Sequence, residues 1–257
     1  MTEKTVLITG GAARIGAATA RGLADDGWMV CVHYNRSKSE AEALCREITS
    51  DGGRAVNVGG NLSERSDVDS LIARASQALG HPLTALVNNA STFSPDTAQT
   101  LTDEMLDYHM DVNLRAPLIL SRDFAAQCPK GTDGIIINMI DQRVLKPNPT
   151  YFSYSLAKSA LYSSTKTLAQ ALAPHIRVNG VGPGPTIQNT GQDEAMFLQE
   201  AKNTLLERPS PPEDILAGIR YLLSAKSVTG QMIAIDSGQH LNWKTQDILS
   251  STPKGAI

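Results

Sequence analysis

The chain carries two alternating patterns of hydrophobic and polar positions. Short apolar runs such as Val6-Leu7-Ile8 lack polar alternation, which is typical of parallel strands buried on both faces. Longer stretches between them place apolar residues three or four positions apart, which predicts amphipathic helices. Strands are predicted at residues 5–9, 29–34, 54–58, 83–88, 134–140, 176–181 and 231–236. Helices are predicted at residues 15–26, 39–50, 64–79, 102–127, 152–172 and 212–223.

This alternation predicts an α/β fold, a doubly wound parallel seven-stranded sheet of the Rossmann type. No repeat or Gly/Ser linker interrupts the 257 residues, so we expect a single domain over residues 1–243. Residues 182–208 are rich in Pro and Gly and then helical, and they separate the last two strands. An insertion there would hang over the carboxyl ends of the strands, where such sheets bind ligands. We therefore expect a substrate lid around 183–208 and a loose polar tail at 244–257.

Composition narrows the classes of function. A net charge of −3 gives no indication of nucleic acid or an anionic membrane as a partner. No apolar run approaches the length of a membrane span, and residues 1–4 show no secretory apolar stretch, so we expect a cytoplasmic protein. Cys31, Cys45 and Cys128 are scattered, which favours reduced core thiols. The five His residues show no metal-binding spacing, and no metal site is predicted.

A glycine-rich turn with the sequence TGGAARIG, residues 9–16, follows the first predicted strand and opens a helix. Glycines permit close approach of the backbone, and a helix N-terminus favours a pyrophosphate. A purely structural turn is the alternative, but the position directly after a buried N-terminal strand favours a dinucleotide. Arg14 would place a guanidinium at the mouth of the phosphate site.

The second predicted strand ends in His33-Tyr34-Asn35-Arg36-Ser37. A dinucleotide fold that selects NAD usually has an acidic residue here, which binds the ribose 2′-hydroxyl. This chain has none; Arg36 and Ser37, with His33 as a further candidate, can hold a 2′-phosphate. We therefore predict NADPH in preference to NADH, against the alternative of a polar loop without a ligand.

Tyr154 and Lys158 are four residues apart, and Asp141 lies thirteen residues before Tyr154. The pair shares one helix face, and an ammonium near a phenol lowers the phenol pKa, so Tyr154 is a candidate proton donor. Tyr151, seven residues before Lys158, also shares that face; it is either a second candidate or part of the substrate pocket. An ionised Asp141 can only accept hydrogen bonds, which favours a substrate with N–H donors or one protonated at nitrogen. A 2-amino-4-oxo pteridine offers both.

Together these motifs resemble the short-chain dehydrogenase/reductase family. The usual glycine pattern of the family is TGxxxGxG, in which Arg14 replaces the middle glycine here, and its NNAG motif is similar to residues 88–91, with Ser91 as the departure. The resemblance implies a homotetramer or homodimer and cofactor contacts at the strand ends. The implied contacts are Gly10, Arg14, Ile15, Gly16, His33, Tyr34, Asn35, Arg36, Ser37, Asn61, Leu62, Asn89, Ala90, Ser91, Tyr154, Lys158, Pro183 and Gly184.

Pteridine reductases and dihydromonapterin reductases of that family are similar in more positions: the basic glycine turn, the HYNRS run, NNAS followed by an aromatic residue, and the Asp. The resemblance implies that Phe93 and the nicotinamide sandwich a pterin. It also implies that Asn113 shapes a water-linked proton path to Lys158, which anchors the nicotinamide ribose. The alternatives are ordinary loop packing for Phe93 and a solvated helix face for Asn113.

The sequence therefore predicts NADPH-dependent reduction of a small molecule, a dihydropterin, dihydromonapterin or dihydrofolate-like ring. The expected catalytic residues are Asp141, Tyr154, Lys158 and Asn113. The expected substrate contacts are Ser91, Phe93, Asp141, Tyr151 and Tyr154. A ketone or 3-oxoacyl-thioester reductase with the same Tyr and Lys is the alternative. A non-catalytic NADP(H)-sensing protein is less favoured, because the Tyr–Lys pair is present.

Overall fold

The computed structural model describes residues 3–189, 191–243 and 245. Over these residues, seven strands form one parallel sheet in the order β3-β2-β1-β4-β5-β6-β7. Their bounds are β1 (Thr5–Ile8), β2 (Met29–Tyr34), β3 (Arg54–Gly59), β4 (Ala85–Asn88), β5 (Gly134–Met139), β6 (Ile176–Pro183) and β7 (Met232–Ile235). The strand order reverses between β1 and β4, which is where open α/β sheets bind ligands. The predicted doubly wound, Rossmann-type fold is confirmed.

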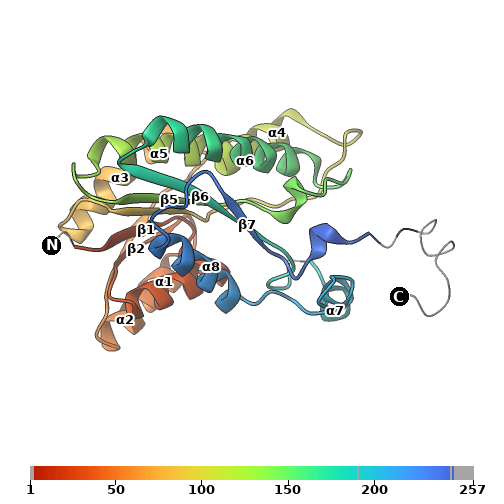
Figure 1. The fold of residues 1–257 in the computed structure, drawn as a ribbon, viewed down its shortest axis with the longest axis horizontal. Helices are drawn as coiled ribbons and strands as arrows, with labels where there is room; N and C mark the ends of the chain where they lie inside the picture. The colour runs from red at the N-terminus through yellow and green to blue at the C-terminus, as the bar shows by residue number, and fades with distance from the viewer. Residues whose placement is uncertain (1–2, 190, 244, 246–257) are drawn as a thin grey trace.

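Helices cover both faces of the sheet (Figure 1). On one face lie α1 (Arg14–Asp25), α2 (Lys38–Ser50) and α8 (Pro212–Ser224); on the other lie α3 (Arg65–Leu79), α4 (Asp103–Met110), α5 (Ala116–Gln127) and α6 (Phe152–Leu172). Val6 and Ile8 pack in the core of the first face, and Leu7 between them packs in the core of the second. The central strands are mostly apolar because both of their faces are buried; polar residues such as Asn88 and Asn138 are buried in hydrogen bonds.

The predicted helix 102–127 is interrupted. A π-helical turn, η1 (Asp111–Arg115), separates α4 from α5, so the expectation of one continuous helix is wrong at this point. A π turn inserts an extra residue into the helical ladder and is frequent at functional sites. It carries Asn113, which is fully buried. The apolar periodicity of residues 102–127 did not predict the π turn within them.

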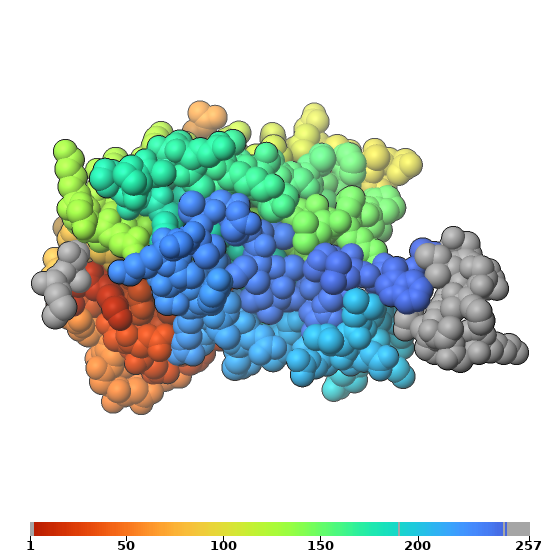
Figure 2. Space-filling model, viewed as in Figure 1, coloured from red at the N-terminus to blue at the C-terminus, as the bar shows by residue number. Residues whose placement is uncertain are grey.

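The segment between β6 and β7 contains α7 (Glu194–Lys202), as predicted for the second half of the insertion. The described residues of the predicted lid, 183–208, are held against the chain that follows β7. Leu206 N–H donates to the Ser237 carbonyl at 3.0 Å, and Asn242 Nδ2 donates to the Asn203 carbonyl at 3.1 Å. Figure 2 shows these light-blue and blue segments in contact at one end of the molecule. The tail predicted for 244–257 lies outside the described residues, except for Thr245.

Of the helices in the described part of the chain, none has the length and apolarity needed to cross a membrane. The cysteines are free thiols; Cys31 and Cys45 are buried and Cys128 is half-buried.

Candidate active site

The glycine turn lies between β1 and α1 and packs against the end of β4. Gly10 has a φ of +60°, and a Cβ there would lie 3.0 Å from the Ala90 Cα; at Gly16 a Cβ would lie 2.2 Å from the Gly10 carbonyl oxygen. Both positions therefore require glycine. Asn89 Nδ2 closes the contact by donating to the carbonyls of Thr9 at 2.8 Å and Gly10 at 3.1 Å. The groups that make these contacts with the turn are neutral.

The His33 side chain supports this turn through a hydrogen bond with its backbone. Its Nδ1 accepts the Gly10 N–H at 3.2 Å, so Nε2 carries the ring proton and donates it to the Gly60 carbonyl at 3.0 Å. The side chain is 1% exposed, and burial lowers the pKa of His33 to about 4. The expectation that His33 binds a 2′-phosphate is wrong, because this neutral ring has both nitrogens occupied within the protein.

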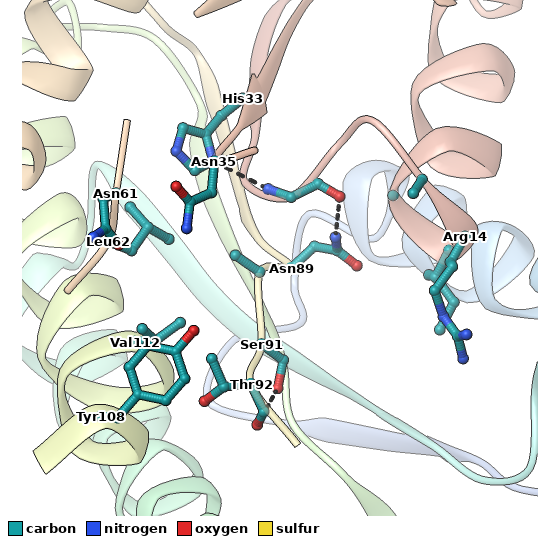
Figure 3. Close-up of a pocket in the computed structure, with 15 residues that line it drawn as sticks. Arg14, His33, Asn35, Asn61, Leu62, Asn89, Ser91, Thr92, Tyr108 and Val112 are labelled. Atoms are coloured by element: carbon teal, nitrogen blue, oxygen red, sulfur yellow. Dashed lines mark hydrogen bonds between the residues drawn. The ribbon is translucent and has the colours of Figure 1, made fainter. Parts of the chain in front are cut away.

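The turn and the ends of β2, β3 and β4 enclose a cavity of about 360 Å³ (Figure 3). Arg14 lies at one side of it, and Asn61 and Leu62 lie at the other. The lining consists of Gly10, Ala13, Arg14, Ile15, Gly16, His33, Asn35, Asn61, Leu62, Asn89, Ala90, Ser91, Thr92, Tyr108 and Val112. Most of the predicted cofactor contacts therefore meet in one place.

Other predicted cofactor contacts lie around this cavity rather than in its wall. Tyr34 packs its ring against Gly59, and Arg36 is exposed next to Asn35 with Ser37 half-buried beside it. Pro183 and Gly184 lie where β6 ends; the Gly184 N–H donates to the Ile235 carbonyl at 3.1 Å, and a Cβ on Gly184 would lie 2.7 Å from the Asp236 Cα.

Four lining residues are not among the predicted cofactor contacts: Ala13, Thr92, Tyr108 and Val112. Tyr108 is 41% exposed on α4, and Val112 belongs to the π turn. Ala13 belongs to the glycine turn and Thr92 follows residues 88–91, so these motifs could have indicated both. No motif marks Tyr108 or Val112.

Arg14 reaches from the glycine turn to the lid. Its backbone has a φ of +54°, in the left-handed region that is uncommon for a residue with a side chain. Its guanidinium donates to the Gln188 carbonyl at 2.8 Å and to the Ile187 carbonyl at 3.0 Å. The predicted phosphate ligand thus also links the cavity to the lid.

Three of the four predicted catalytic residues, Asp141, Tyr154 and Lys158, meet at the end of β5. Tyr154 Oη donates to Asp141 Oδ2 at 2.7 Å, and Asp141 Oδ1 accepts the Arg143 N–H at 2.8 Å. Lys158 Nζ, one helical turn after Tyr154, donates to the Met139 carbonyl at 2.7 Å. Tyr154 is 5% exposed and Lys158 is 2% exposed. A carboxyl group, a phenol and an ammonium therefore share a site with little water.

Burial dominates the protonation of this group. Burial raises the pKa of Asp141, against the opposing hydrogen bonds from Arg143 and Tyr154. Burial first and the Asp141 charge second raise the pKa of Tyr154 well above its usual value of 10.0. Burial lowers the pKa of Lys158 from 10.5 to about 8, although Asp141 opposes the change.

The expectation that Lys158 lowers the pKa of Tyr154 is therefore wrong for this arrangement. The ammonium lies 5.7 Å from the centre of the Tyr154 ring, and its hydrogen bond goes to Met139. The phenol hydroxyl faces a carboxylate instead, and a negative neighbour disfavours the phenolate. Tyr154 consequently keeps its proton at neutral pH.

Phe93 lies beside this group in an aromatic cluster. Its ring stacks on Tyr151 at a centroid distance of 4.0 Å and meets Tyr154 edge-on at 4.7 Å. Tyr151 begins α6 with a left-handed backbone, φ 53°. Tyr154 is hydrogen-bonded to Asp141, which favours Tyr154 as the proton donor. Tyr151 stacks on Phe93, which favours Tyr151 as part of the wall of the substrate site.

Asn113 holds the loop that follows β4. Its Oδ1 accepts Ser91 Oγ–H and Thr92 N–H, both at 2.9 Å, and its Nδ2 donates to the Thr92 carbonyl at 3.0 Å. A solvated helix face is excluded by its complete burial. The proton path to Lys158 stays a prediction, since the hydrogen bonds of this amide go to the loop.

A buried polar cluster of Asp96, Ser153 and His109, each at most 6% exposed, ties the same loop to α6. Ser153 donates its N–H to both Asp96 carboxylate oxygens at 3.2 Å and its Oγ–H to Oδ2 at 2.5 Å. Ser153 Oγ then accepts from His109 Nδ1 at 2.6 Å, and His109 Nε2 accepts the Ser94 N–H at 3.3 Å. Asp96 thus caps α6, because Tyr151 offers no side-chain cap. These residues lie 44 and 57 positions apart, and no sequence pattern joins them.

Within the described residues, no group of three or more His, Cys, Asp or Glu side chains is placed to hold a metal ion.

Known proteins resemble the chain over nearly its whole length. The family model of the short chain dehydrogenase matches residues 4–198. An uncharacterised oxidoreductase of Methylorubrum extorquens is 34% identical, covering 91% of this chain and 97% of that protein. A 3-oxoacyl-[acyl-carrier-protein] reductase of Synechocystis is 31% identical, covering 93% of this chain and 97% of that protein.

Solved structures show the same likeness. The FolM alternative dihydrofolate reductase 1 from Brucella canis, complexed with NADP, superposes with a TM-score of 0.92 at 44% identity. The match covers 95% of this chain and 97% of that one.

Proposed function

The chain belongs to the short-chain dehydrogenase family, and we propose that it is an NADPH-dependent reductase of a pteridine such as a dihydropterin, dihydromonapterin or dihydrofolate-like ring. One observation carries the proposal: a carboxyl group, Asp141, accepts the hydrogen bond of the catalytic phenol at 2.7 Å. The oxygens of a carboxyl group accept from the N–H groups of an amino-pyrimidine, whereas the carbonyl of a ketone or thioester offers no N–H donor. The similarity to a dihydrofolate reductase of known structure supports the same substrate class.

The cavity fits NADPH. Gly10 and Gly16 leave the backbone open beside the N-terminus of α1, which suits a pyrophosphate, and no carboxylate lies between β2 and α2. Asn61 and Leu62 would meet the adenine end, Arg36 and Ser37 the 2′-phosphate, and Lys158 the nicotinamide ribose. The bound cofactor supplies the hydride.

The protein supplies the proton. Tyr154 holds a proton at Oη and can give it to a nitrogen of the pterin ring. If Asp141 were ionised at that moment, the transfer would leave two negative oxygens 2.7 Å apart, which is strongly unfavourable. A protonated Asp141 avoids this: its Oδ2–H then donates to Tyr154 Oη, the reverse of the hydrogen bond described above, and its proton moves to the phenol oxygen as the phenol proton leaves for the pterin. The burial that raises the pKa of Asp141 therefore favours the productive state.

The experiment compares NADPH oxidation with 7,8-dihydrobiopterin, 7,8-dihydrofolate and an acetoacetyl thioester. We expect turnover with at least one pterin, and a loss of about 10²–10⁴ in kcat for Tyr154→Phe with the affinity for NADPH retained. Turnover with the thioester alone would support a 3-oxoacyl reductase, the activity named for the Synechocystis relative, and would overturn the proposal.

We also propose a cytoplasmic homotetramer or homodimer. Free thiols suit a reducing compartment, and exposed Leu156 on α6 offers apolar surface for a second copy. Sedimentation of the purified chain tests the assembly, and a monomer at micromolar concentration would contradict it.

A further inference from the structure

We propose that Arg143 is a specificity-determining residue that binds an anionic substituent on the pteridine, so that the preferred substrate is an acidic pterin rather than a neutral one. The inference rests on the proposed function and adds to it the chemistry of the substrate's side chain.

Arg143 is fixed next to the residues that would meet the substrate ring. It belongs to the short helix η2 (Gln142–Val144), and its N–H donates to Asp141 Oδ1 at 2.8 Å. The centre of its guanidinium lies 5.7 Å from the Phe93 ring and 5.1 Å from the Tyr151 ring. A ring bound between Asp141 and Phe93 would therefore lie close to this cation.

The guanidinium is charged and lacks a counterion. Over residues 3–189, 191–243 and 245, no carboxylate forms an ion pair with it and no acceptor takes its hydrogen bonds; its recorded neighbours are the two aromatic rings. Other arginines are satisfied: Arg220 pairs with Asp26 at 2.6 Å, and Arg14 donates to the lid. A half-buried arginine with unused, forked donors at a ligand site is suited to a carboxylate or phosphate.

Asp141 does not take this role. Its two oxygens already accept from Tyr154 and from the Arg143 backbone, and no ion pair joins the two side chains within the described residues. The charge of Arg143 nevertheless opposes the rise in the pKa of both Asp141 and Tyr154. The guanidinium thus lies near enough to the reacting groups to contact a bound molecule, with its donors still free.

Two kinds of pterin carry a suitable anion: a dihydrofolate, through its carboxylates, and a phosphate ester of a small dihydropterin. The test uses 7,8-dihydrofolate, 7,8-dihydroneopterin monophosphate and neutral 7,8-dihydrobiopterin. Steady-state kinetics at saturating NADPH would compare the wild type, Arg143→Met, which keeps an apolar stem, and Arg143→Lys, which keeps the charge. Lys146→Met is the matched control, because Lys146 is an exposed cation three residues away that donates to the Asn242 carbonyl.

We expect Arg143→Met to raise KM for the preferred acidic pterin about 10- to 100-fold, the effect of losing a charge-assisted hydrogen-bonded pair. KM for dihydrobiopterin should stay within about twofold. Any change in kcat should be the same for acidic and neutral pterins, because the lost charge acts on the pKa of Asp141 and Tyr154 whichever pterin is bound. Arg143→Lys should recover part of the loss in KM, and the control should change nothing. Added salt should raise KM for the acidic pterin in the wild type and much less in Arg143→Met. The acidic substrate that responds identifies the anion.

Equal changes in KM for acidic and neutral pterins would overturn the inference, since they would show that Arg143 only packs against the aromatic cluster. An unchanged KM for both acidic pterins would overturn it as well. If the wild type reduces no pterin, the proposed function fails separately; equilibrium binding of folate and of biopterin to the NADP⁺-loaded protein then tests Arg143 without turnover. Quenching of protein fluorescence by NADPH verifies that each variant is folded.

Discussion

The cofactor side and the reaction side of the site are built from different kinds of residue. On the cofactor side, glycines, the Asn89 amide and a neutral His33 hold the turn after β1, and the lining near it is uncharged apart from Arg14. On the reaction side, Asp141 and Lys158 bring ionisable groups into a site with little water. The cofactor side presents backbone N–H groups to an anion and needs no shifted pKa, whereas proton transfer needs groups whose pKa values are displaced. Substitutions on the two sides should therefore change different kinetic constants.

The largest effect should come from Asp141→Asn. The amide cannot pass a proton to Tyr154, so we expect kcat for the pterin to fall about 10²–10⁴-fold, with the affinity for NADPH unchanged. Asp69→Asn is the matched control, because Asp69 is 61% exposed on α3 and far from the reacting groups in the sequence. If Asp141→Asn turned over pterin at the wild-type rate, Asp141 would have no part in the proton transfer. The reaction side would then not depend on this ionisable group.

The pH dependence sharpens the same prediction. The protonated form of Asp141 is the productive one, so kcat/KM should fall as the pH rises through its pKa, which burial has raised above 3.8. A second fall should follow near pH 8, where Lys158 loses its proton. In Asp141→Asn the first fall should vanish and the second should remain. Because the groups interact, the profile reports the pair and not one residue.

An intermediate effect is expected from Asp96→Ala. Removing the buried cap of α6 should lower the free energy of unfolding by about 2–3 kcal/mol and loosen the Phe93 loop. We expect kcat/KM for the pterin to fall about tenfold, a typical cost of misplaced substrate contacts, while KM for NADPH stays constant. Asp96→Asn keeps an acceptor for Ser153 and should recover part of both losses. A loss of stability without a change in pterin kinetics would show that the cluster only supports the fold.

The smallest effect should come from Arg36→Ala on the cofactor side. We expect KM for NADPH to rise about tenfold, because one charged contact with the 2′-phosphate is lost, while NADH kinetics stay unchanged. Arg46→Ala, an exposed arginine on α2, serves as the control. Equal effects on both cofactors would refute the 2′-phosphate assignment.

Much of this architecture could be predicted from the sequence. Buried parallel strands form mostly apolar runs, so each strand was located within two residues of its bounds. The helix 152–172 was predicted with the bounds that α6 has. The helical spacing of apolar residues did not predict η1, because a single π turn changes too few positions of that pattern to be detected. Asp96, Ser153 and His109 could not be found either, since their contact exists only after the β4 loop folds onto α6.

The sequence by itself determined the parallel seven-stranded sheet, the glycine turn and the placement of Tyr154, Lys158 and Asp141 near one another, because these follow from local periodicity and spacing. Only the tertiary structure decided their protonation. It turned the Tyr154 hydroxyl to Asp141, directed Lys158 to the Met139 carbonyl, and buried Tyr154 and Lys158 with Asp141 half-buried beside them. A pKa depends on the solvent removed and on the charges that surround a group, and both are properties of the packed molecule.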